Sequence, residues 1–194
     1  YAFLILKVRE IMQTYRAGID IGSTTVKLVI LDEKDQILFG DYRRHHAHTQ
    51  GTLKSLLMEA SKTLGQCDLK TKITGSGSIN LGKALEIDFV QEVVAVAAAL
   101  KQTAPQTDAA IELGGEDAKI LFLTNGTEVR MNGSCAGGTG AFIDQMATLL
   151  KMGADEMNKA AEQATRTYTI ASRCGVFAKS DVQPLINQGA KTED

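Results

Sequence analysis

The chain has 194 residues, of which 44% are hydrophobic and 23% charged, and its formal net charge is −2. Its basic residues are interleaved with carboxylates and it has no Trp, which argues against nucleic-acid binding. The first apolar run, Ala2 to Leu6, is far shorter than the roughly 20 residues that cross a bilayer, so no membrane role is expected. We expect a globular protein, and its three widely spaced cysteines favour the reducing cytoplasm.

The first strong element is a hairpin over residues 18–31, in which apolar β-forming residues flank a Gly-Ser-Thr turn. A loop of small residues lets backbone N–H groups approach phosphate oxygens, and its hydroxyls add donors. Asp20, just ahead of the loop, can hold the waters of a magnesium ion that bridges phosphate to protein. The candidate nucleotide-binding residues here are Gly22, Ser23, Thr24, Thr25 and Lys27.

The middle of the chain predicts a helix over 49–64, a short strand over 69–74 and an apolar helix over 90–104, followed by Pro105 at a domain join. All three histidines lie within 43–48, which we interpret as a solvated loop, with a metal site as the alternative. The predicted domains are an extension without an assigned role (1–11), a first half (12–107) and a second half (108–194).

A second hairpin, over residues 111–123, repeats the acid, the glycine and the lysine of the first in the same register. Either loop alone is a weak signal, because a glycine turn after a strand is common. The pairing of the two predicts a two-hairpin nucleotide site. The site is not a P-loop, because the sequence has no Gly-Lys-Ser or Gly-Lys-Thr motif. Lys27 and Lys119 occupy matching positions, and we expect outward lysines on an exposed strand face. The second hairpin adds the catalytic candidates Glu112 and Glu116 and the nucleotide-binding candidates Gly114 and Gly115.

Two cysteines precede the last predicted helices. Cys135 leads into a helix over 141–150, and Cys174 leads into a helix over 176–186. We therefore predict that each cysteine lies at a helix N-terminus, where thiolates are favoured. By themselves such residues also suit buried small hydrophobes, a disulfide or a zinc site.

Several motifs resemble known families. Segments 18–25 and 112–117 are similar to the phosphate motifs of the actin, heat-shock chaperone and sugar kinase superfamily, and segments 132–142 and 172–181 resemble the activators of 2-hydroxyacyl-CoA dehydratases, the BadF/BadG/BcrA/BcrD ATPase family. The resemblance implies an α/β, actin-like (ribonuclease H-like) duplicated fold. The adenosine motif of such enzymes comes late in the second half, so we expect that half to be incomplete at the C-terminus. Glu112 and Glu116 replace an Asp and a Gln of the short members and resemble the longer, fused activators.

The same resemblance implies a function. ATP, hydrolysed to ADP, and Mg²⁺ would bind between the halves, with Asp20 at the magnesium and Glu112 or Glu116 orienting the attacking water. A 4Fe-4S cluster takes four thiolates, so Cys135 and Cys174 of two subunits would share one cluster in a homodimer. An electron would pass to a 2-hydroxyacyl-CoA dehydratase or benzoyl-CoA reductase type partner. Two rivals remain: a sugar or acetate-type kinase with incidental cysteines, and a non-catalytic nucleotide-binding dimerisation module.

Overall fold

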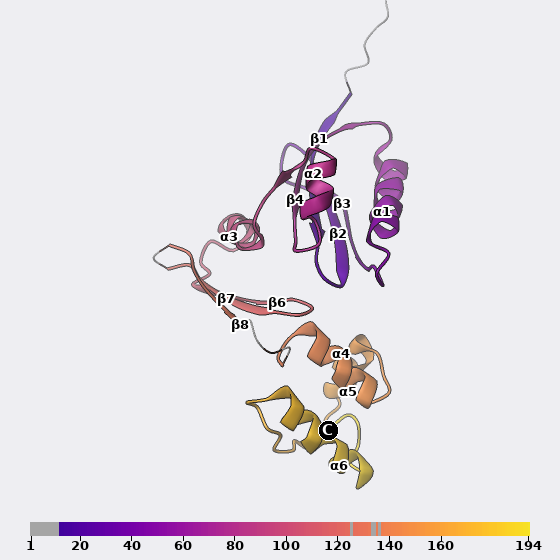
Figure 1. Cartoon of the computed structure of the whole chain (residues 1–194), viewed down its shortest axis with the longest axis vertical. Coiled ribbons are helices and arrows are strands. Elements are labelled where there is room, and N and C mark those ends of the chain that lie inside the picture. Colours follow the sequence, from indigo (N-terminus) through magenta and orange to yellow (C-terminus); the bar gives the residue numbers. More distant parts are fainter. Residues whose placement is uncertain (1–11, 125, 133–134, 136) are drawn as a thin grey trace, which may run out of the picture. The chain divides into compact units, whose positions relative to one another are not determined.

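The computed structural model describes residues 12–194 except 125, 133, 134 and 136, so the predicted extension 1–11 lies outside the described residues. The chain separates into two compact units, and the boundary along the sequence falls between Val96 and Ala97. This point lies within helix α3 (Glu92–Thr103), ahead of the proline at which the sequence predicts the join. Both units contain strands and helices, as the predicted α/β class requires (Figure 1).

The first unit is built on a five-stranded sheet with the order β3-β2-β1-β4-β5. Its strands are β1 (Thr14–Ile21), β2 (Thr25–Leu31), β3 (Ile37–Arg44), β4 (Asp68–Thr74) and β5 (Asp88–Phe89). The first three pair antiparallel, whereas β4 runs parallel to both β1 and β5. A parallel neighbour needs a crossover, which α1 (Thr49–Leu64) supplies between β3 and β4.

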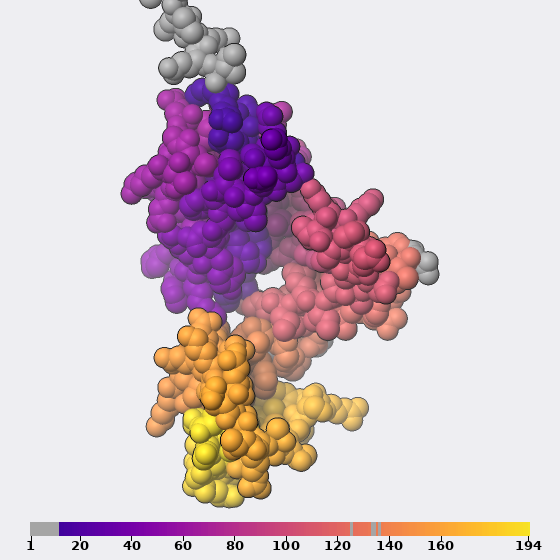
Figure 2. All heavy atoms as spheres, turned by 180° about the vertical axis from the view of Figure 1, so that it is seen from behind, coloured from indigo at the N-terminus to yellow at the C-terminus, as the bar shows by residue number. Residues whose placement is uncertain are grey.

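The core of the first unit lies between β2 and α1, which Figure 1 shows alongside the sheet. Period-two alternation buries Val26, Leu28 and Ile30 of the strand. Helical spacing buries Leu53 and Leu56 on one face of the helix, whose bounds agree with the prediction. The side chains of this unit, indigo to magenta in Figure 2, form a continuous packed body.

The second unit begins with a three-stranded antiparallel sheet in the order β6-β7-β8. Its elements are β6 (Ala109–Leu113), β7 (Ala118–Phe122), β8 (Glu128–Asn132), α4 (Gly140–Leu149), α5 (Ala154–Ala161) and α6 (Gly175–Asn187). The sheet repeats the topology of β1-β2-β3, in agreement with the repeat found in the sequence. Helices α5 and α6 both contact α4.

Three short elements are not predicted from the sequence: α5, β5 and α2 (Ile79–Ala84). The predicted apolar helix over 90–104 exists as α3, but none of its residues is buried. Across residues 12–194, with the four gaps noted above, no helix has the length and apolarity needed to span a membrane.

Candidate functional site

In the first hairpin a lysine lies opposite the carboxylate predicted to hold magnesium. Asp20 and Lys27 face each other across the β1–β2 pair, with Lys27 Nζ 2.6 Å from Asp20 Oδ2. The ammonium also lies 5.6 Å from the centre of the Tyr42 ring, within cation–π range. The pair leaves 28% of the Asp20 side chain exposed. The carboxylate is thus oriented by the lysine and still open to water.

The turn between β1 and β2 carries the predicted phosphate ligands. The Gly22 N–H donates to the Thr25 carbonyl oxygen at 2.9 Å and closes the turn. Ser23 is exposed and Thr24 is half-buried, whereas Thr25 is buried. Ser23 and Thr24 can therefore meet an anion from solvent, while the Thr25 side chain belongs to the packed interior.

A second glycine-rich loop, which contains Gly75 and Gly77, packs against this hairpin. It follows β4, whose parallel pairing with β1 sets Thr74 opposite Asp20. A Cβ on Gly75, whose φ is 98°, would lie 2.5 Å from Asp20 Oδ1 and overlap the Ile21 carbonyl oxygen. The Gly77 N–H donates to that same oxygen at 2.8 Å. Only glycine fits position 75, and the loop braces the strand end that presents Asp20. In the sequence, this loop could have been found from its two glycines, which end a strand that follows a helical crossover.

The histidine cluster is less uniform than the sequence predicts. His46 and His48 are exposed, as expected of a solvated loop, but His45 is only 9% exposed. Its ring nitrogen Nε2 lies 3.3 Å from the carbonyl oxygen of Gly22 in the first hairpin. Among the side chains that the structure describes, no three or more of His, Cys, Asp and Glu gather as a metal site would require.

In the second hairpin the matching lysine is buried, which corrects the expectation of an outward side chain. The side chain of Lys119 is 8% exposed, and its Nζ lies 3.2 Å from Asp117 Oδ2 and 3.6 Å from Glu112 Oε1. Glu112 and Lys119 are register partners across β6–β7, as Asp20 and Lys27 are across β1–β2. The duplication therefore extends to a cross-strand ion pair. The other catalytic candidate, Glu116, is exposed.

The second loop is bonded directly to the start of helix α4. The Gly114 N–H donates to the Asp117 carbonyl oxygen at 2.9 Å, which repeats the turn of the first hairpin. The carbonyl oxygens of Gly114 and Gly115 accept from the N–H groups of Gly140 and Ala141 at 2.8 and 2.9 Å. These donors are among those that a helix N-terminus leaves without a partner inside the helix. The loop between β6 and β7 and the start of α4 therefore form one hydrogen-bonded assembly.

The two cysteine loops of the second unit touch each other. Cys174 is the N-cap of α6, as predicted, whereas Cys135 lies ahead of the α4 N-cap, Thr139, and so is not at a helix N-terminus. A Cβ on Gly137 would lie 3.1 Å from the backbone nitrogen of Gly175, which follows Cys174. A Cβ on Gly175 would likewise lie 3.1 Å from Gly137 Cα, so a side chain at either position would crowd this close approach.

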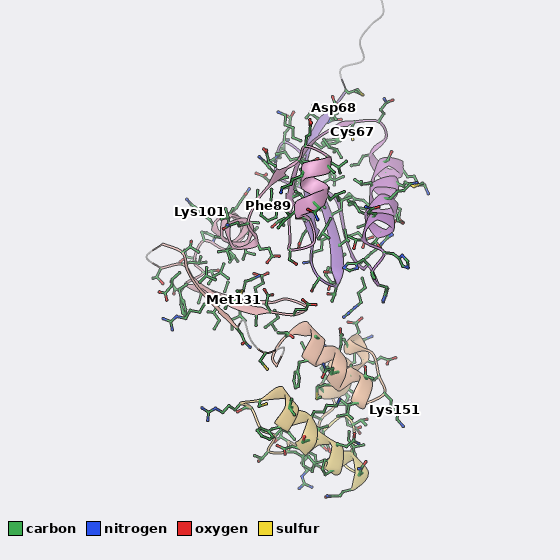
Figure 3. The ribbon with its side chains drawn as sticks, in the orientation of Figure 1. Cys67, Asp68, Phe89, Lys101, Met131 and Lys151 are labelled. Carbon is green, nitrogen blue, oxygen red and sulfur yellow. The ribbon has the colours of Figure 1, made fainter. Side chains whose placement is uncertain are left out.

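The chemistry of the two thiols suits an iron-sulfur cluster. Cys135 is exposed and Cys174 half-buried, and both are free thiols. The Gly137 N–H donates to Cys135 Sγ at 3.3 Å, and Asn132 Nδ2 donates to the Cys135 carbonyl oxygen at 3.0 Å. Hydrogen bonds to sulfur and a helix N-terminus both favour thiolate ligands. The third cysteine, Cys67, lies between α1 and β4 in the first unit (Figure 3).

Known proteins share this sequence and fold. The chain is 34% identical over 185 residues to the 2-hydroxyisocaproyl-CoA dehydratase activator of Clostridioides difficile, a match that covers 93% of this chain and 69% of that protein. It is 30% identical over 191 residues to the (R)-2-hydroxyglutaryl-CoA dehydratase activating ATPase of Acidaminococcus fermentans, covering 94% and 72%.

Solved structures agree. The Clostridium difficile activator with bound ADPNP matches with a TM-score of 0.83 and 32% identity, covering 93% of this chain and 68% of that one. The fold is therefore the actin-like α/β fold. Residues 17–194 match the family described as the BadF/BadG/BcrA/BcrD ATPase family, and this chain belongs to that family of ATPases.

Proposed function

We propose that the protein is an ATP-hydrolysing activator of a CoA-substrate dehydratase or reductase, working as a homodimer that shares one 4Fe-4S cluster. Relatives at 34% and 30% identity bear the names of dehydratase activators. One observation in the second unit carries the proposal. The loop with Gly114 and Gly115, which resembles the family's second phosphate motif, is hydrogen-bonded to helix α4, and the loops of Cys135 and Cys174 touch each other.

The first hairpin supplies the phosphate and magnesium contacts. Ser23 and Thr24 would donate to the phosphates from hydroxyl and backbone groups, and Asp20 would hold Mg²⁺ through water. Lys27, beside Asp20, adds a positive charge near the phosphates.

The second hairpin positions the water. Glu112 is engaged by Lys119, so the exposed Glu116 is the better candidate to orient the nucleophile. Water adds to the γ-phosphorus, the bond to the bridging oxygen breaks, ADP leaves, and the water proton passes to the carboxylate.

The cysteine loops hold the redox group. One cluster supplies single-electron transfer to the partner enzyme. Each subunit would contribute Cys135 and Cys174, so that twofold symmetry would complete the set of four thiolates without another ligand. The close approach of Gly137 and Gly175 holds the two cysteine loops together, and Asn132 holds the Cys135 loop through its carbonyl oxygen.

Helix α4 couples nucleotide binding to the position of the Cys135 loop. The carbonyl oxygens of Gly114 and Gly115 hold the first turn of this helix. A displacement of the loop on ATP binding would move that turn, and the Cys135 loop with it. A discrete two-state rearrangement of this element is what coupling between two sites requires.

Anaerobic reconstitution with iron and sulfide tests the proposal. We expect about four irons per two chains, the full complement of one 4Fe-4S cluster. The substitutions Cys135→Ala and Cys174→Ala should each abolish cluster binding. Cys67→Ala, the matched control in the first unit, should retain it. ATP turnover is measured on the same samples.

Iron retained by both cysteine variants would sink the proposal. ATP-dependent phosphorylation of a sugar or carboxylate by an iron-free protein would favour the kinase instead. Nucleotide binding without turnover would favour the dimerisation module.

A further inference from the structure

His45 is a buried imidazole under the first phosphate loop. It follows the last residue of β3 and is 9% exposed. Its backbone N–H donates to the Thr24 carbonyl oxygen at 3.1 Å, and its Nε2 lies 3.3 Å from the Gly22 carbonyl oxygen. One residue therefore binds two carbonyl groups of the same short loop, on either side of Ser23.

The other ring nitrogen fixes the tautomer. The Ala47 N–H donates to His45 Nδ1 at 3.1 Å, so Nδ1 carries a lone pair and the ring proton lies on Nε2. The Nε2–H can then donate to the Gly22 carbonyl oxygen. Both ring nitrogens are satisfied only in the neutral Nε2–H form, because a proton on Nδ1 would face the Ala47 N–H.

The backbone after the ring is shaped for this contact. His46 and Ala47 have φ values of 45° and 66°, in the left-handed region that residues with a Cβ rarely adopt. The resulting tight turn brings the Ala47 N–H back to the ring and the His48 N–H to the His45 carbonyl oxygen at 2.6 Å. Two successive strained residues persist only where the surroundings over-determine them, and here they aim the imidazole.

We propose that His45 is a positioning residue that holds the first phosphate loop in its anion-binding conformation. In a trans peptide the C=O and the next N–H point in opposite directions. By holding the Gly22 carbonyl oxygen, the ring turns that dipole away from the phosphates and points the Ser23 N–H away from the ring, towards the open side of the loop. This inference rests on the proposed function for the role of the loop, but the ring geometry does not.

Histidine-selective ¹⁵N NMR of the full chain tests the geometry without nucleotide. The chain has three histidines, so the His45 signals are assigned by their loss in His45→Asn. We expect a neutral ring with a protonated Nε2 and a bare Nδ1 at neutral pH. A ring protonated on Nδ1, alone or together with Nε2, would overturn the proposal.

Two amide substitutions separate the two ring contacts. Asn places an acceptor near Nδ1 and loses the donor to Gly22, whereas Gln can place a donor near Nε2. His45→Asn should weaken binding of ATP with magnesium about three- to tenfold, the effect of one lost hydrogen bond. His45→Gln should stay within about twofold of the wild type, and so should His48→Gln, an exposed control whose φ of −102° lies outside the left-handed region.

Equal weakening by Asn and Gln, in step with equal losses of thermal stability, would show a packing role only and overturn the proposal. Unchanged binding in both variants would overturn it as well. If the wild type bound no ATP, the proposed function would fall, and the NMR result would decide the ring geometry independently.

Discussion

Removing the charge of Lys119 should destabilise the second unit more than removing that of Lys27 destabilises the first. The Lys119 ammonium is buried, with carboxylate oxygens at 3.2 and 3.6 Å. At an effective dielectric constant of about 20, each attraction amounts to about 5 kcal/mol before desolvation. Desolvation of the ammonium offsets several kcal/mol of this sum. We therefore expect Lys119→Met to lower the free energy of unfolding by about 2–4 kcal/mol.

Lys27→Met is the matched control, because the same cross-strand pair lies there with 43% of the lysine side chain exposed. Its loss should be at most about 1 kcal/mol. Urea unfolding followed by circular dichroism gives both values. The double variant Lys119→Met/Glu112→Gln should recover part of the loss, since it removes one of the two uncompensated carboxylates. Equal losses in the two single variants, or no recovery in the double, would refute the reasoning.

Two further predictions concern the first unit. Gly75→Ala should lower the free energy of unfolding by at least about 2 kcal/mol and impair ATP binding, because its Cβ would overlap the end of β1. Gly51→Ala is the control, because open space surrounds that position, and it should be neutral or slightly stabilising. Urea unfolding measures both. Hydrogen bonds from Arg43 lower the pKa of Glu59 below its ordinary value of 4.5. The stabilisation from the ionised Glu59 is present above the ordinary pKa and is lost as the pH falls through the lower pKa of the folded state. On going from about pH 6 to pH 3, the Glu59→Gln variant should therefore lose less stability than the wild type, as measured by thermal unfolding.

Local pattern explains what could be predicted of the fold. The hairpins and the helix from Thr49 to Leu64 carry their own period-two and helical spacing, so their positions follow from neighbouring residues alone. The duplicated acid and lysine fall in the same register for the same reason. The short elements α2, β5 and α5 were missed because they have too few residues to show a period.

Placement in three dimensions explains what could not be predicted. The burial of Lys119 and His45 depends on which strands and loops pack around them, and neither differs in sequence pattern from an exposed neighbour. Gly75 reaches Asp20 only because β4 pairs parallel with β1, a contact between residues far apart in the chain. The roles assigned to the candidate site residues remain predictions.

The bonds between the second loop and α4 also constrain protein engineering. The carbonyl oxygens of Gly114 and Gly115 accept from the N–H groups of Gly140 and Ala141, each 26 residues further along the chain. A graft that exchanged only β6 and β7 with a relative would set a foreign turn against a native helix. Chimaeras of this family should therefore carry the segment from β6 through the first turn of α4 as one cassette.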